Sequence, residues 1–350
     1  MRYLNFIPVI LLCGMTVSCN SYKKLYEAQE YDQVIQTLSP RVCDGDLKPE
    51  HVNWVAASYH KANQADHERI QQLKAAGQPD AWPEIYQRYC SMAGRCEALS
   101  CLPSQVKRDI NYAPLDLNED MTVARNKAEA FLMAKINQLL GTHNSDDAAE
   151  AGSYIMQLRH TVPNNSHIQE YGRVAMLHQA EKVMVGFDNE KELPLPRGFV
   201  AELLALDANA LPSNITTTLK DKGQRADVHV YVVLKDVKCK PDHLDKVAFN
   251  ETLGDKVAKV TDYTMSKSAT VSGIVEFYDA SVNRVRFSYP FEVSSDFNYQ
   301  YATVEGDREA CSEETLHRIE NPSLPFPTDE SLLLDAAREL NRQLTVELAK

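Results

Sequence analysis

The sequence predicts an α+β protein in which an all-helical N-terminal domain precedes an antiparallel β-meander domain with a packed C-terminal helix. Between residues 21 and 186, apolar residues recur with the helical period and β-branched clusters are rare. Between 226 and 301, apolar and polar residues alternate as in half-buried strands. Residues 328–350 carry one apolar stripe at helical spacing. Helices followed by consecutive strands are typical of α+β folds.

Length and charge narrow the class of protein. The chain has 350 residues, with 37 basic and 49 acidic side chains and a net charge of −12. This length allows two domains of ordinary size, each with its own core. The acidic excess argues against a dedicated nucleic-acid binder, which needs basic surface to neutralise phosphates.

The N-terminus has the pattern of an export signal. Arg2 precedes an apolar run from Leu4 to Val17, which is shorter than the roughly 20 apolar residues of a spanning helix but typical of a signal peptide. Ser18 and Cys19 follow the run. This arrangement resembles a Bacteroidota-type bacterial lipoprotein signal. The resemblance implies that residues 1–18 are removed and that Cys19 carries the lipid, for example palmitate; an ordinary signal peptide with an incidental Cys19 is the alternative.

Two further residues bear on this resemblance. Thr16 stands where the commonest lipoprotein signal has Leu. Surface-exported lipoproteins of this kind resemble one another in acidic residues directly after the lipidated Cys, whereas the first acid here is Glu27. The resemblance therefore implies a lipid-anchored protein of the outer membrane that faces the periplasm.

Six cysteines remain beyond the signal, and an even number in an exported protein predicts disulfides. Cys239 and Cys311 are the only ones in the C-terminal half, so we expect them to pair. The N-terminal half holds a second possible disulfide set: Cys43, Cys90, Cys96 and Cys101. A four-Cys zinc site is the alternative for that set, but it lacks the CxxC spacing of structural zinc, and we expect no metal.

The N-terminal domain, residues 19–186, is predicted to consist of helices joined by short loops, which favours a stack or bundle of antiparallel helix pairs. Proline and glycine punctuate the pattern. The expected helices cover residues 21–40, 48–76, 80–98, 120–141, 145–161 and 166–184.

Two stretches of this domain resemble tetratricopeptide repeats. One is Leu25-Tyr26-x-x-Gln29-Glu30-Tyr31-x-x-Val34-x-x-x-Leu38, and the other places Ala151, Ile155, Leu158 and Pro163 at the offsets of the second helix of such a repeat. The resemblance implies a solenoid of helix pairs with a concave groove suited to peptides or proteins. An irregular bundle without a functional groove is the alternative.

A polar, proline-bearing linker at residues 187–198 separates the second domain, residues 199–350. A short helix at 198–206 precedes the strands. Consecutive strands with short turns predict an antiparallel meander. The expected strands cover 226–235, 255–264, 268–278, 284–293 and 297–301, and Thr328 is placed to cap the final helix.

Motifs of catalysis are missing from the sequence, which has no GxGxxG after a strand, no phosphate loop, no GxSxG and no HExxH. His60 and His67 lie two helical turns apart, about 10 Å along the axis, which is too far for one metal. We therefore name no catalytic residue and expect no cofactor. Glu305 and Asp307 are the only carboxylate pair that a hydrolase could use.

The sequence therefore favours a binding protein: a lipid-anchored scaffold or adaptor in envelope assembly or secretion, attached to the membrane and to an envelope protein partner. A lipoprotein that captures glycans or peptides with its C-terminal sheet is the second hypothesis. Its candidate residues are the aromatic side chains of the strands, which are Tyr263, Tyr278, Phe287, Tyr289, Phe291, Phe297, Tyr299 and Tyr301.

Overall fold

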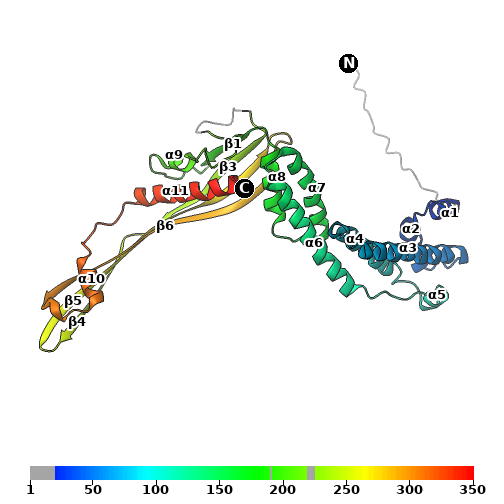
Figure 1. The fold of residues 1–350 in the computed structure, drawn as a ribbon, viewed down its shortest axis with the longest axis horizontal. Coiled ribbons are helices and arrows are strands. Elements are labelled where there is room, and N and C mark those ends of the chain that lie inside the picture. Colours follow the sequence, from blue (N-terminus) through cyan, green and yellow to red (C-terminus); the bar gives the residue numbers. More distant parts are fainter. Residues whose placement is uncertain (1–19, 190, 219–224) are drawn as a thin grey trace, which may run out of the picture. The chain divides into compact units, whose positions relative to one another are not determined.

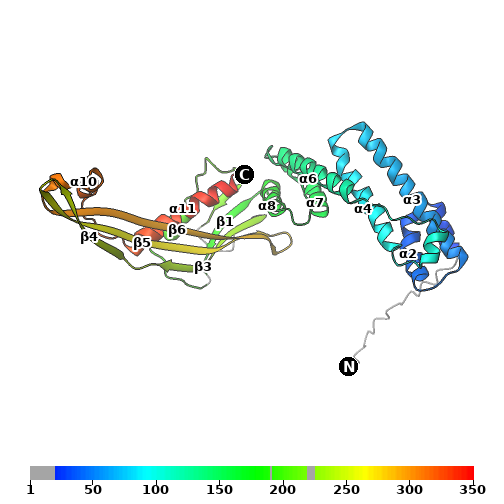
Figure 2. The same ribbon diagram turned by 90° about the horizontal axis from the view of Figure 1, so that it is seen from below.

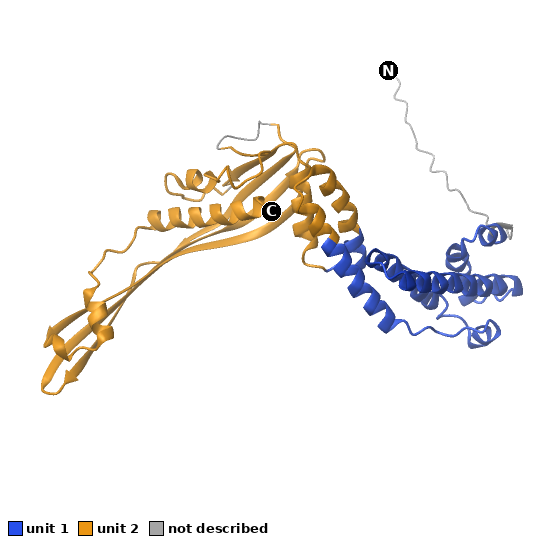
Figure 3. Cartoon of the chain, in the orientation of Figure 1, with its two compact units in different colours: residues 1–134, 157–164 blue, residues 135–156, 165–350 orange. Residues whose placement is uncertain are grey.

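The computed structural model describes residues 20–189, 191–218 and 225–350. The chain divides into two compact units, shown in different colours in Figure 3: Met1–Ala134 with Gln157–Asn164, and Lys135–Met156 with Asn165–Lys350. We call them unit 1 and unit 2. The predicted signal peptide, residues 1–18, and the predicted lipid attachment residue Cys19 lie outside the described residues.

The first half of the described chain is helical, as predicted (blue to green in Figure 1). A 3₁₀ turn covers Pro79–Ala81. The α-helices are α1 (Asn20–Glu27), α2 (Tyr31–Cys43), α3 (Pro49–Ala76), α4 (Trp82–Ala98), α5 (Ser104–Asp109), α6 (Asn118–Leu140), α7 (Ser145–Thr161) and α8 (Ile168–Gln179).

Local signals explain several of these boundaries. Proline at the first position of α3 needs no hydrogen-bond partner for its nitrogen, and Gly77 ends that helix at φ 68°, a conformation that favours glycine. The predicted helix 21–40 is divided in two, because Gln29 adopts φ 61° between α1 and α2. The predicted helix 166–184 ends at Gln179, and the valine-rich residues after it enter the sheet.

The second half of the chain forms one mixed sheet with flanking helices. Its strands are β1 (Val183–Asp188), β2 (Ile215–Thr217), β3 (Val228–Cys239), β4 (His243–Leu253), β5 (Lys256–Asp279) and β6 (Arg284–Gly306). The strand order is β2-β1-β3-β5-β4, and β6 pairs with β5. The helices are α9 (Phe199–Leu204), α10 (Glu313–Glu320) and α11 (Asp329–Leu348).

The predicted antiparallel meander describes only part of this sheet. β3, β4, β5 and β6 pair antiparallel, but β1 pairs parallel with both β2 and β3. Parallel pairing requires a crossover connection, and the chain between β1 and β2 contains α9. β1, β2 and β4 were not predicted as strands.

β5 and β6 are single long strands where the sequence predicted two strands each. Their register is continuous from the pair Ala258–Gly306 to the pair Phe277–Phe287. β3 and β4 lie end to end along the other side of β5, since β3 pairs with its second half and β4 with its first half. The sheet is therefore a long ribbon (Figure 2).

Two apolar clusters lie on opposite faces of this ribbon, because successive side chains of a strand alternate between faces. One face near the β5–β6 turn buries Val271 and Val293 with Leu340 of α11. The other face, near the β4–β5 turn, buries Val260 and Ala302 with α10 side chains. The predicted packing of the C-terminal helix on the sheet is confirmed, and Thr328 caps that helix by accepting a hydrogen bond from the Ser331 amide.

Candidate functional site in the helical unit

A cavity in unit 1 is lined by residues of α2, α3 and α4. Its volume is about 380 Å³, and a second cavity of about 210 Å³ adjoins it. Asp32, Ser91 and Arg95 line both cavities, and we call the two together the α2–α4 crevice. The remaining lining residues are Gln29, Tyr31, Ile35, Gln36, Ala62, Ala65, Asp66, Glu84, Gln87, Arg88, Gly94 and Ala98.

A buried guanidinium forms the floor of the crevice. The side chain of Arg95 on α4 is only 4% exposed. It donates to the side-chain oxygens of Asn63 and Asp32, each at 3.0 Å, and to Asp66. A buried charge is tolerated only when it is paired and hydrogen-bonded, so Arg95 ties α2, α3 and α4 together at this point.

A second arginine extends the network toward solvent. Arg88 donates to Asp66 at 2.7 Å and to Glu84 at 2.8 Å. Glu84 also receives two hydrogen bonds from Arg69, at 2.9 and 3.1 Å. These bonds, above all those from Arg69, hold the pKa of Glu84 below its usual range. The network joins three arginines to three carboxylates, and all six except Arg69 line the crevice, so the crevice is strongly polar without a large net charge.

The walls offer uncharged hydrogen-bonding groups. Gln36 and Gln87 line the crevice with amide side chains, each of which can donate and accept. Small residues leave room beside them: a Cβ added to Gly94 would meet no atom within 4 Å. Donors and acceptors next to open space suit the main chain of a peptide, which presents both kinds of group.

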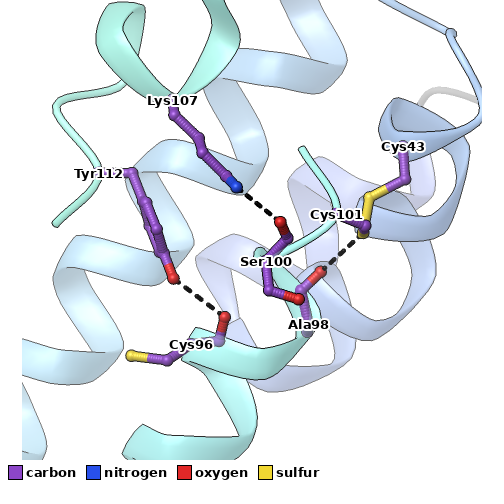
Figure 4. Close-up of a disulfide and its surroundings, with 7 residues drawn as sticks. All are labelled: Cys43, Cys96, Ala98, Ser100, Cys101, Lys107 and Tyr112. Atoms are coloured by element: carbon purple, nitrogen blue, oxygen red, sulfur yellow. Dashed lines mark hydrogen bonds between the residues drawn. A yellow bond between two sulfur atoms is a disulfide. The ribbon is translucent and has the colours of Figure 1, made fainter. Parts of the chain in front are cut away.

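A disulfide joins the two helices that form the walls. Cys43, the last residue of α2, is bonded to Cys101, three residues after α4, with their Cα atoms 5.6 Å apart (Figure 4). Lys107 donates a hydrogen bond to the Ser100 carbonyl in the loop after α4 at 2.6 Å, and Tyr112 donates one to the Cys96 carbonyl in the last turn of α4 at 3.1 Å. The disulfide therefore limits how far α2 and α4 can separate.

This bond involves two of the four cysteines predicted for the N-terminal set. Cys90 and Cys96 are free thiols. The Cys43–Cys101 bond uses two of the four sulfurs that the zinc alternative requires, and among the described residues no group of three or more His, Cys, Asp or Glu side chains could hold a metal ion. His60 bonds the Ile110 carbonyl at 2.9 Å.

The predicted Cys239–Cys311 disulfide is not formed in this structure, and both thiols are free. Cys239 lies opposite Ala269 of β5, whereas Cys311 packs in the cluster of Val260. Nine residues of strand separate these positions, which corresponds to roughly 30 Å, and a disulfide requires Cα atoms within about 7 Å. Membership of one domain was therefore too weak a reason to pair them.

The carboxylates considered for a hydrolase lie outside any cavity described here. Glu305 pairs with Lys259 at 3.4 Å, and Asp307 lies 4.0 Å from Lys256. Both belong to the exposed end of β6 and the turn that follows it. Sequence reasoning missed Arg95 and Asp66, and no local signal could reveal them, because they are 29 residues apart and meet only when α3 and α4 pack.

None of the helices in the described part of the chain is both long and apolar enough to span a membrane. No protein-family model matches the chain, and no curated protein matches it. One similar solved structure, at 2.35 Å, is described as a minor lipoprotein from Acinetobacter baumannii. It is 10% identical, with a TM-score of 0.19, and the match covers 47% of this chain and 90% of that one. At that TM-score the likeness assigns neither fold nor function.

Proposed function

We propose that this protein is a lipid-anchored, periplasm-facing scaffold of the outer membrane that binds a segment of an envelope protein in the α2–α4 crevice. The crevice is the observation that carries the binding role. It combines a buried guanidinium floor with amide side chains on its walls. The anchor rests on the resemblance of residues 1–19 to a lipoprotein signal.

The helix pairs support the same role. The stretch from Leu25 to Leu38, which resembles a tetratricopeptide repeat, includes the α1–α2 turn and the part of α2 that lines the crevice. Stacked helix pairs commonly use such surfaces for peptide or protein ligands. The proposed role is binding, and we name no catalytic residue in the crevice.

The experiment is site-specific photocrosslinking in living cells, with the photoreactive residue at Ser91, which both cavities share. We expect one envelope protein to be captured in stoichiometric amount. Gly94→Leu should abolish the capture, because its side chain enters open space in the crevice and leaves the fold intact. Gly152→Leu is the matched control, since it also has open space around it but lies on α7. Equal capture by both variants would refute the crevice as the binding site.

A second candidate function is glycan capture by the sheet. The rings of Tyr263 and Tyr301 stack across β5 and β6, with centroids 4.5 Å apart and planes within 2°. Tyr299 continues the row, with its ring 6.3 Å from that of Tyr301. These three tyrosines are half-buried, and the exposed parts of their rings can contact the apolar faces of sugars. A glycan array probed with wild type and with Tyr301→Ala tests this candidate, which requires that binding be lost in the variant.

A further inference from the structure

The outer edge of β6 is unpaired over a long stretch. β6 pairs with β5 on one side, and no described strand pairs with its other side. An edge strand presents a row of free backbone donors and acceptors, and proteins usually protect it with lysine, proline, bulges or short length. β6 has 23 residues, and its pairing with β5 is regular from Ala258 to Phe277.

Two hydrogen bonds show which backbone groups face outward. The Ser268 carbonyl of β5 accepts from the Lys240 amide, so it points toward β3 and β4. Asp296 of β6 lies opposite Ser268. Two opposite residues of an antiparallel pair either bond each other or both direct their backbone groups outward, so the N–H and C=O groups of Asp296 point away from β5. The Gln300 carbonyl, four residues on, accepts from the Asn321 side chain at 2.8 Å and so also faces outward.

One segment of the β6 edge has outward backbone groups that are free to bond another strand. It begins after Pro290, which has no N–H to offer, and it ends at Gln300, whose carbonyl is occupied by Asn321. Between them, four residues direct their N–H and C=O groups outward, and in the described chain none of these groups has a backbone partner: Glu292, Ser294, Asp296 and Asn298.

The side chains along this segment differ between the two faces. Glu292 and Asp296 are exposed on one face, and there is no Lys or Arg from Phe287 to Gly306. On the other face Phe297 is half-buried and lies 6.2 Å from the ring of Phe326. A strand added at this edge would place its alternate side chains beside these two sets.

We propose that the edge of β6 between Pro290 and Gln300 binds an extended segment of another protein, which joins the sheet as an additional strand. The segment carries basic residues on the face of Glu292 and Asp296 and apolar residues on the face of Phe297. Main-chain hydrogen bonds supply affinity in this mode of recognition, and the alternate side chains supply specificity. The proposal is independent of the α2–α4 crevice, which belongs to unit 1.

The probe is a fluorescent heptapeptide of alternating Lys and Val, and an alternating Glu and Val peptide is its control. We expect the full-length protein to bind the Lys peptide more tightly in fluorescence anisotropy. Hydrogen exchange followed by NMR gives the location. The outward amides of the four edge residues should exchange fast in the free protein and become protected by the Lys peptide, while their neighbours are protected throughout.

Asn298→Pro removes an outward N–H donor without removing a hydrogen bond to β5. It should lower the affinity for the Lys peptide about tenfold. Ala248→Pro is the matched control, since Ala248 has the same outward orientation on the other free edge, in β4. The double variant Glu292→Lys, Asp296→Lys should reverse the peptide preference, and it provides a test that does not depend on proline.

Three results would overturn the proposal. The first is equal binding by the two proline variants, and the second is protection of β4 amides in place of the β6 amides. The third is protection of the β6 edge in the free protein that rises with protein concentration, because a second copy of the chain would then occupy the edge.

Discussion

Arg95 on α4 and Asp66 on α3 form an ion pair beneath the α2–α4 crevice, in which the Arg95 side chain is 4% exposed and the Asp66 side chain 13%. The same guanidinium reaches Asp32 on α2 at 3.0 Å, and the other oxygen of Asp66 accepts from Arg88. One buried charge therefore sets the relative positions of three helices, and with them the geometry of the crevice.

Removing the Asp66 carboxylate should destabilise the protein strongly. Asp66→Ala deprives Arg95 and Arg88 of a shared partner, and we expect a loss of about 3 kcal/mol in the free energy of unfolding, measured by urea denaturation. Glu314→Ala is the control. This substitution removes an ion pair between Arg318 and Glu314, in which the Glu314 side chain is 83% exposed. It should change the free energy of unfolding by less than about 0.5 kcal/mol. A similar effect of both variants would mean that the buried pair is not important for stability.

Two helical glycines should respond in opposite directions to alanine. A Cβ on Gly172 of α8 would lie 2.5 Å from the ring of Phe287, whereas a Cβ on Gly152 of α7 would meet nothing within 4 Å. Gly172→Ala should therefore cost about 1–3 kcal/mol through overpacking. Gly152→Ala should stabilise by about 1 kcal/mol through helix propensity. Thermal unfolding of the two variants side by side tests this, and a stable Gly172→Ala protein would disprove the close packing of α8 against Phe287.

The Cys43–Cys101 bond should contribute substantially to the stability of unit 1. It closes a loop with a sequence separation of 58, for which the chain-entropy model gives about 4 kcal/mol. Cys101→Ser should therefore lower the urea midpoint, and reduction of wild type with dithiothreitol should produce the same shift. Cys239→Ser removes an exposed free thiol and should leave the midpoint unchanged, as should adding the reductant to Cys101→Ser.

Mild acid should weaken the packing of α8. Burial, followed by the nearby ring of His143, lowers the pKa of His178, and the two rings are joined at 3.2 Å between Nδ1 of His143 and Nε2 of His178. The unfolded chain then binds a proton more readily than the folded one. The stability from this group is complete above about pH 6.5 and is lost as the pH falls below it.

Urea midpoints at pH 7.5 and 5.5 measure this effect. The difference between the two should be smaller in His178→Gln than in wild type. His243→Gln, which replaces an exposed histidine of β4, should retain the wild-type difference. If His178→Gln behaves like wild type, His178 does not contribute to the acid sensitivity.

The accuracy of sequence prediction differed between helices and strands for a physical reason. Helix ends are set by local residues, such as Pro49 and Gly77 at the two ends of α3, so the predicted range 48–76 is close to the observed one. β4 was missed because both of its faces are largely exposed, and alternation in sequence reports burial of one face. β5 was predicted as two strands because its buried face changes along its length. Where β5 pairs with β3, the buried side chains lie on one face of the sheet, and where it pairs with β4 they lie on the other.

The sequence by itself determined the helical first half, the strand-rich second half and the amphipathic C-terminal helix, since all three depend on the spacing of apolar residues along a few turns or strands. The tertiary structure alone decided the parallel pairing of β1, the choice of Cys43 and Cys101 as the bonded pair, and the meeting of Asp32, Asp66 and Arg95 in one crevice. Each of these joins residues far apart in the chain. Their contact depends on how whole helices and strands pack, which no local pattern records.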